Sequence, residues 1–403
     1  MKEEKMMILT MLEEGKITSE EAIKLMEALE DVEMTKDYDE KSQMENEKFQ
    51  DKGYSKPLFN TLEDIGSDIG NVLSNMFDGL KELGNSFGFK HSYETITTDL
   101  DLDLSTIENP SLELKAINGS IGMRPTDMDK LFIKVTCQYK NGLFSLDEPY
   151  FDFYVKDNKV VFNPKYNNNI SIKLDVLLPK KHYEEIVLDS TNGKIGIWDL
   201  NVDTLNCITT NSSIDIVDIN AKEIDLATKN GRIECRDTSS NIIKANTTNS
   251  NIFLMNIECK EIDVRTANAK IILNDIDGER IGCKTSNGSI EVEDISCDII
   301  HLNTSNGRII CNEIDTNKIK DIRLITSNSS INFRLPNSSR DTYFDLETSM
   351  GNINLEIPNL IYKTNRQVNL GLKNIVAHSV DFDENKDHLR FIASTSNGSI
   401  KIY

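Results

Sequence analysis

A strict 19-residue repeat of asparagine constrains the fold of this chain more than any other feature of its sequence. Each repeat asparagine stands two residues after a Thr or Ser, and most units read T-x-N-G/S/A-x-I. The repeat asparagines are Asn192, Asn211, Asn230, Asn249, Asn268, Asn287 and Asn306. Further units with other spacings stand at residues 116–121, 326–331, 348–353 and 395–400. A fixed period of about 20 residues is typical of a solenoid, in which each unit packs on the next.

Five fixed positions within the repeat carry apolar residues almost without exception. They lie three, five, eight, thirteen and fifteen residues after each asparagine. For the unit of Asn249 they are Ile252, Leu254, Ile257, Ile262 and Val264. Spacings of two and a bias to β-branched residues are typical of strands. We therefore predict two short strands and two turns per unit, stacked as a parallel β-solenoid over residues 91–403.

The asparagine at each corner leads to further expectations. Asn and Gly tolerate the left-handed region of backbone space, so the Asn-Gly, Asn-Ser and Asn-Ala corners are expected to use it. Stacked units lie about 4.8 Å apart, which lets asparagine amides hydrogen-bond from one unit to the next. The Thr column two residues earlier is expected to form a similar ladder.

The first 90 residues have a different character from the repeat. Residues 1–30 carry the caps and apolar spacing of a small α-helical hairpin, and residues 31–57 form a charged flexible linker. In residues 58–90 apolar residues step by three and four, which predicts an amphipathic helix. Its candidate docking face consists of Ile65, Ile69, Val72, Met76, Phe77 and Leu80. This helix is expected to cap the open end of the solenoid, with partner binding, self-association and membrane contact as alternatives.

The charge and the cysteines of the chain restrict its ligands and its compartment. A net charge of −21 argues against nucleic acid, which needs basic patches, and makes contact with anionic lipid weak. The seven cysteines form no C-x-x-C pair, so they are expected to be small core residues in a reducing compartment. The sequence shows no signal peptide and no apolar run of about 18 residues. We therefore predict a cytoplasmic protein, with attachment to the cell envelope or surface exposure by a non-standard route as alternatives.

One column of the repeat is a candidate for chemistry. Seven residues after each asparagine stands a carboxylate or an amide, as in Asp199, Asp218 and Asp237. Stacked carboxylates can bind a cation or act as the acid–base pair of a glycan-cleaving enzyme, but the uniformity of the column favours a turn role. The common motifs of catalytic, cofactor and metal sites do not occur, so no cofactor, metal or catalytic residue is expected.

Outward-facing apolar residues form the candidate interaction patch. They are Trp198, Val217, Phe253, Met255 and Ile272. Trp198 is the only tryptophan of the chain. Apolar groups gathered on a surface indicate a binding site or a covered interface. We expect the helix of residues 58–89 or a loop of the 122–170 insertion to cover this patch, with an exposed binding site as the alternative.

Two parts of the chain resemble a known family. Residues 8–22, I-L-T-M-L-E-E-G-K-I-T-S-E-E-A, resemble the SHOCT-like helical module that opens YvlB/LiaX-type proteins of Gram-positive bacteria. The T-x-N-G-x-I units resemble the "putative adhesin" β-solenoid domain that follows this module in that family. The resemblance implies a role in cell-envelope stress through binding of a protein or an envelope component, and it supplies no catalytic residue.

Three hypotheses on function follow. The leading one is a non-enzymatic interaction scaffold that binds a protein or an envelope component through its solenoid surface and its N-terminal helices. Self-association through the helices is an additional expectation. A surface-displayed adhesin and a glycan-acting β-helix enzyme are the alternatives.

Overall fold

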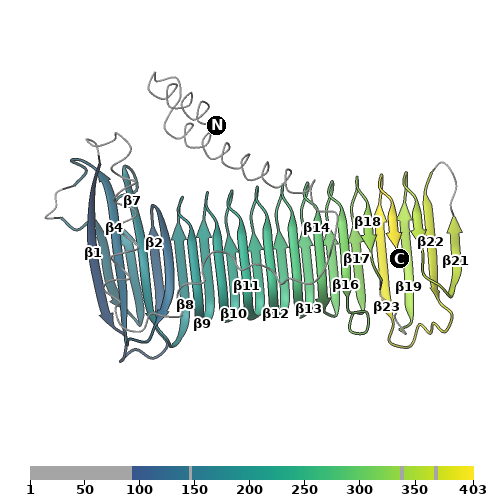
Figure 1. Cartoon of the computed structure of the whole chain (residues 1–403), viewed down its shortest axis with the longest axis horizontal. Coiled ribbons are helices and arrows are strands. Elements are labelled where there is room, and N and C mark those ends of the chain that lie inside the picture. The colour runs from purple at the N-terminus through teal and green to yellow at the C-terminus, as the bar shows by residue number, and fades with distance from the viewer. Residues whose placement is uncertain (1–92, 145–147, 336–339, 367–370) are drawn as a thin grey trace, which may run out of the picture. The chain divides into compact units, whose positions relative to one another are not determined.

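The computed structural model describes residues 93–403, except for residues 145–147, 336–339 and 367–370. The predictions for the helical hairpin, the linker and the amphipathic helix with its docking face lie outside the described residues. Within the described residues, 24 strands join in one hydrogen-bonded sheet (Figure 1). No helix in this part of the chain is long and apolar enough to cross a membrane.

The regular repeat forms a parallel ladder with one long strand for each 19-residue unit. These strands are β9 (Ile195–Thr209), β10 (Ile214–Ala227), β11 (Ile233–Asn246), β12 (Ile252–Arg265) and β13 (Ile271–Lys284). Each residue pairs with its equivalent in the next unit, so that Ile214 pairs with Ile233 and Ile233 with Ile252. The neighbouring arrows in the middle of Figure 1 are these strands. The predicted parallel β-solenoid is confirmed.

Each long strand runs through both halves of its unit and bends between them, which differs from the predicted pair of separate strands. The bend residue stands seven after the asparagine and has a positive φ, such as 59° at Asp218 and 50° at Asp237. The same conformation occurs at Asp199, Asn256, Asp275, Asp294 and Glu313. The prediction of left-handed asparagine corners is wrong, because none of the seven repeat asparagines has a positive φ. Asp and Asn tolerate this region better than most residues, which explains the acidic column.

Beyond β13 each unit is divided into two strands, as predicted for the whole repeat. The strands are β14 (Ile290–Ser296), β15 (Ile299–Asn303), β16 (Ile309–Ile314), β17 (Asp321–Ile325) and β18 (Ile331–Phe333). β14 and β15 both pair with β13, so the two halves of the unit continue as two arms of the same ladder.

The N-terminal end of the ladder contains antiparallel pairs. Its strands are β1 (Tyr93–Asp103), β2 (Ser111–Ala116), β3 (Asn118–Thr126), β4 (Lys130–Lys140), β5 (Phe151–Lys156), β6 (Lys159–Pro164), β7 (Ile170–Pro179) and β8 (His182–Ser190). β3 and β8 pair with the two halves of β9. One arm then runs through β7 and β4 to β1, and the other through β2 and β6 to β5.

At the C-terminal end, the order of the strands in the ladder differs from their order in the sequence. Its strands are β19 (Thr342–Thr348), β20 (Ile353–Leu355), β21 (Leu360–Arg366), β22 (Lys373–Ser379), β23 (Leu389–Thr395) and β24 (Ile400–Ile402). β23 lies between β17 and β19, and β24 lies between β18 and β20, so the last unit of the chain is inserted into the ladder. β22 and β21 follow as an antiparallel pair.

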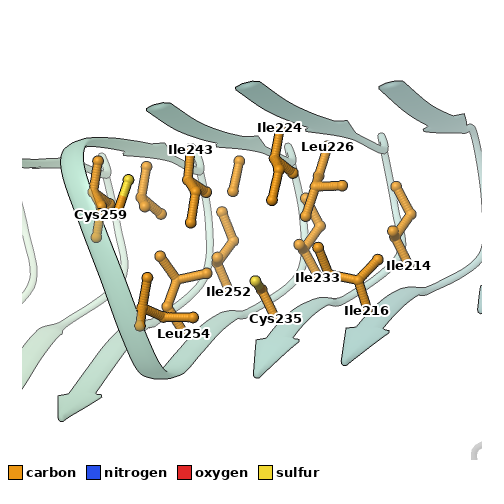
Figure 2. Packing of buried hydrophobic residues seen from close by; sticks show 14 of the residues in the cluster. Ile214, Ile216, Ile224, Leu226, Ile233, Cys235, Ile243, Ile252, Leu254 and Cys259 are labelled. Carbon is orange, nitrogen blue, oxygen red and sulfur yellow. The ribbon is translucent and has the colours of Figure 1, made fainter. Parts of the chain in front are cut away.

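The core lies between the two halves of each unit. The five predicted apolar columns are buried, and Figure 2 shows side chains such as those of Ile224 and Ile243 opposite those of Ile214 and Ile233. A further inward column, ten residues after the asparagine, escaped the sequence analysis because its residues are small. Its members are Val202, Ala221, Ser240, Cys259, Gly278 and Cys297.

The predicted asparagine ladder is confirmed. The side-chain amide of each repeat asparagine donates to the carbonyl oxygen of the previous one, at 2.6 Å for Asn249 to Asn230 and 2.7 Å for Asn268 to Asn249. The predicted threonine ladder is wrong. Each Thr instead donates to a backbone carbonyl of the previous unit, as Thr247 does to Gly231 at 3.0 Å. Because these threonines are buried, the carbonyl satisfies a hydroxyl that would otherwise lack a partner.

Candidate functional site

A long groove lies on the second half of the units. It has a volume of about 730 Å³ and is lined by residues of β8 to β13 and of the turns before β15 and β17. With a strand spacing of about 4.8 Å, the part from β8 to β13 alone is about 24 Å long. This length suits an extended chain better than a compact small molecule.

The floor of the groove is the column of small residues. Ala221, Ser240, Cys259 and Gly278 all line it and all face inward. A Cβ at Gly278 would lie 2.1 Å from the carbonyl oxygen of Cys259, so the chain has no room for a side chain there. Burial raises the pKa of the Cys259 thiol to about 11, which leaves it protonated and unreactive at neutral pH.

Ion pairs occupy both ends of the groove. Near β8, the Lys222 ammonium and the His182 ring lie 2.8 and 3.0 Å from the Asp203 carboxylate. The hydrogen bond from Lys222 holds the pKa of Asp203 below its ordinary value. At the other end, Lys318 contacts Asp277 at 3.0 Å.

The middle of the groove carries polar groups that are open to a ligand. These groups belong to Asn220, Ser239, Asn241, Glu258, Lys260 and Glu279. All six residues are exposed, and within the described part of the chain their side chains make no hydrogen bond or ion pair. Acidic side chains outnumber lysines along the groove, so it offers amide, hydroxyl and carboxylate partners and little attraction for a polyanion.

The predicted apolar patch is divided on the structure. Trp198 and Val217 are neighbours in one column, and Phe253 and Ile272 are neighbours in the next. Arg236 separates Val217 from Met255, so the five residues do not form one continuous surface. Met255 is 47% exposed, whereas the other four are half-buried. The helix of residues 58–89 lies outside the described residues, and one residue of the 122–170 insertion, Arg124, lies over Trp198.

Trp198 lies on the sheet next to the groove. A Cβ at Gly196 would be 2.5 Å from the indole ring, so the ring rests on this glycine. The guanidinium carbon of Arg124 lies 5.0 Å from the ring centroid, within the range of a cation–π contact. A second hollow of about 270 Å³ is lined by both residues, and it shares His182 and Asn201 with the groove. The two cavities are therefore adjacent.

The acidic column lies at the bends of the units. Its residues are exposed at the bends, as the turn interpretation predicts, and Asn256 donates to Asp237 at 2.6 Å. Within the described residues no His, Cys, Asp and Glu side chains are grouped as a metal site would need. The positive φ of these residues accounts for the preference for Asp and Asn in this column.

Comparison with known proteins places this architecture in a family. The family model described as Toastrack DUF4097 matches residues 153–275 and again residues 236–388, together more than half of the chain. This chain belongs to the Toastrack DUF4097 family. The family model of the SHOCT-like domain matches residues 3–33 of this Toastrack protein.

This Toastrack protein also matches an individual relative, at low sequence identity. It is 27% identical over 233 residues to the "uncharacterized protein YvlB" of Bacillus subtilis (strain 168), and the match covers 52% of this chain. The chain spans 58% of the length of that relative.

Three solved structures are also similar to it. A "putative cell adhesion protein" from Clostridium sporogenes has a TM-score of 0.25 at 11% identity, covering 77% of this chain and 99% of its own. A "putative adhesin" from Parabacteroides merdae has a TM-score of 0.36 at 10% identity, covering 54% and 96%. A "putative adhesin" from Bacteroides fragilis has a TM-score of 0.30 at 16% identity, covering 54% and 97%. Scores this low carry no conclusion about ligand or partner.

Proposed function

We propose that this protein is a non-enzymatic interaction scaffold that holds an extended, polar polymer along its groove. The observation that supports this most directly is the row of exposed polar side chains without partners in the middle of the groove, at Asn220, Ser239, Asn241, Glu258, Lys260 and Glu279. A rigid ladder positions these groups at a regular spacing of about 4.8 Å. Groups held in place by a scaffold lose little entropy when they bind a ligand.

The chemistry of the groove selects the class of polymer. Amides, hydroxyls, carboxylates and one free ammonium hydrogen-bond well to a polar chain. The excess of carboxylates disfavours nucleic acid. An envelope polysaccharide or a polar extended peptide segment fits these limits.

Binding to an insoluble cell-wall polysaccharide tests the proposal. We expect the full chain to sediment with it, and the double variant Ser239→Arg with Asn241→Arg to lose about tenfold in affinity because two long side chains fill the groove. The matched control is Asn303→Arg with Ser305→Arg, which places the same changes on exposed residues outside the groove. Equal affinity of the groove variant and the wild type would refute this use of the groove.

We further propose that the protein acts at the bacterial cell envelope, in its response to stress. The SHOCT-like match at residues 3–33 and the Toastrack match support this through the family resemblance alone. Biotin labelling of intact cells, with a cytosolic protein as control, tests the location. Labelling of this protein alone would indicate surface exposure, and protection until lysis would place it inside the cell, where partners of the N-terminal residues are then the next question.

A further inference from the structure

Both ends of the ladder present a strand with an unpaired edge. Within the described residues, β1 pairs with β4 alone and β21 pairs with β22 alone. β1 lies at one end of the ladder and β21 at the other (Figure 1). The free edge of a strand carries backbone N–H and C=O groups, which can extend a sheet into another chain.

The core is incompletely covered at the same two ends. Among the described residues, the half-buried apolar side chains that pack against the core all lie outside the run from β9 to β13. They include Ile96, Leu100 and Leu102 of β1 at one end, and Leu355 and Leu360 at the other. A further layer of strands on each end would bury these side chains, as each unit of the run buries those of its neighbours.

The two end strands carry opposite charges. The exposed positions of β1 include Asp99, Asp101 and Asp103, and β1 contains no lysine or arginine. β21 contains Lys363 and Arg366, both exposed, and no carboxylate. Two β1 strands side by side would bring like charges together, and so would two β21 strands. β1 beside β21 brings opposite charges together.

The apolar and charged positions also match by side of the sheet. On β1, the three aspartates alternate with half-buried residues such as Leu100, which face the core. On β21, Tyr362 pairs with the buried Ala377, so it lies on the core side. The Lys363 ammonium lies 5.9 Å from the ring of Tyr343 on the outer side. A sheet that continues from β21 to β1 therefore places apolar groups on one side and opposite charges on the other.

The local contacts of the two strands leave these edges selective. Asp101 pairs with Lys130 at 2.9 Å, but both side chains are about half exposed, so this pair is weak. β21 has an irregularity in its register between Tyr362 and Thr364. An irregular edge that carries a lysine disfavours pairing with a like edge, and an acidic strand is then the matching partner.

We propose that copies of this chain associate head to tail, with β1 of one copy pairing with β21 of the next. The contact joins two different surfaces, so each added copy leaves one edge open and the assembly grows into a filament. Backbone hydrogen bonds and apolar burial stabilise the contact, and the charges select its direction. This inference concerns the ends of the ladder and does not depend on a ligand in the groove.

Sedimentation velocity of the full chain over a range of concentrations tests this association. We expect the average mass to rise beyond that of a dimer as the concentration increases at low salt. We expect the mass to fall at high salt, because salt screens charges that are exposed. A protein that stays monomeric throughout, or whose mass stops at that of a dimer, would overturn the proposal.

Charge reversal at one end distinguishes this contact from association through another surface. Lys363→Glu with Arg366→Glu makes both ends acidic. Asp99→Lys with Asp101→Lys and Asp103→Lys makes both ends basic. We expect each variant alone to associate at least about tenfold more weakly than the wild type, because like charges then meet. An equimolar mixture of the two should associate again, which also shows that both variants are folded.

A matched control separates the effect of position from that of net charge. Lys229→Glu with Lys284→Glu makes the same change of net charge as the β21 variant, on exposed residues away from both ends. We expect this control to associate like the wild type. Wild-type association of the two end variants would refute the contact between β1 and β21 and would assign the interface to another surface.

Discussion

The regular run from β9 to β13 and the two ends of the ladder fill their cores with different side chains. The run contains aliphatic residues, cysteines and alanines, and no aromatic side chain is buried in it. The ends contain the buried aromatic residues Tyr139, Tyr150, Phe162, Tyr183, Phe333, Phe344 and Phe391. Phe391 packs against Phe333 and Phe344, with ring centroids 4.8 and 5.7 Å apart.

The difference shows two ways of filling a narrow core with side chains. In the run every unit stacks on an equivalent one, so small β-branched residues fill a space of constant shape. At the ends the chain changes direction and pairs antiparallel, as β1 does with β4 and β22 with β19. Large rings fill the wider and less regular space that results. The asparagine ladder continues from the run into both ends, whereas buried aromatic packing is found at the ends alone among the described residues.

The largest expected effect concerns alkaline pH, which should weaken the run more than the ends. In the run, burial raises the pKa of Cys259 to about 11 and that of Cys235 to about 12, and it raises those of Cys207 and Cys283 as well. Above the ordinary pKa of a thiol, the unfolded chain binds fewer protons than the folded one. This contribution to stability is therefore complete below about pH 8.5 and is lost as the pH rises through the folded pKa.

Each fully buried thiol is expected to cost about 1.4 kcal/mol for each pH unit in this range. Urea unfolding at pH 7.5, 8.5 and 9.5 measures the loss. Replacing Cys207, Cys235 and Cys283 of the run by Ala should reduce the pH dependence about three times as much as Cys137→Ala at the N-terminal end, because it removes three buried thiols instead of one. Equal slopes for the triple variant and the wild type would contradict this assignment.

Truncation of the core should cost more at the ends than in the run. We expect Phe391→Ala to lower the free energy of unfolding by about 3–5 kcal/mol and Ile252→Ala by about 2–4 kcal/mol, since the larger ring leaves the larger cavity. Both residues are fully buried. Urea unfolding followed by circular dichroism compares them, with Phe391→Leu as a milder control. A greater loss for Ile252→Ala would mean that the ends do not depend on aromatic packing.

The asparagine ladder predicts a difference between the middle of the ladder and its last unit. Asn249 takes part in two ladder bonds, to Asn230 and from Asn268, whereas Asn397 makes one, to Asn328. We expect Asn249→Ala to lower the free energy of unfolding by about 1–2 kcal/mol and Asn397→Ala by about half as much. Thermal unfolding of the two variants measures this. Equal losses would show that the ladder bonds add little in water.

The smallest effect concerns the bend residues of the run. At the positive φ of 59° of Asp218, Ala is strained, so Asp218→Ala should cost about 1 kcal/mol, whereas Asp218→Gly should cost less. Thermal unfolding gives the ranking of the two variants.

The variants Asp218→Ala and Asp237→Ala also test the hypothesis of a glycan-acting enzyme. Loss of an envelope-glycan cleavage activity with the fold retained would support this hypothesis. Absence of turnover by the wild-type protein would refute it.

The sequence by itself determined the repeating part of this protein. The 19-residue spacing of asparagine and the five apolar columns predict the parallel stacking, the inward faces and the amide ladder. These features depend on contacts between equivalent residues of adjacent units, so the repeat pattern of the sequence is enough to predict them. The same reasoning placed the left-handed residue at the asparagine, seven positions from the bend where it occurs, because both columns carry residues that tolerate it.

Only the tertiary structure decided the candidate site and the ends. Arg124 lies over Trp198 because β3 joins the ladder next to β9 after a long excursion of the chain. The groove exists because a column of small residues, from Ala221 to Gly278, faces inward at every unit, and small residues give no apolar signal in a sequence. The insertion of β23 and β24 between earlier strands is likewise a contact between distant segments. Such contacts depend on how the insertions fold back onto the ladder, and the repeat period does not predict this.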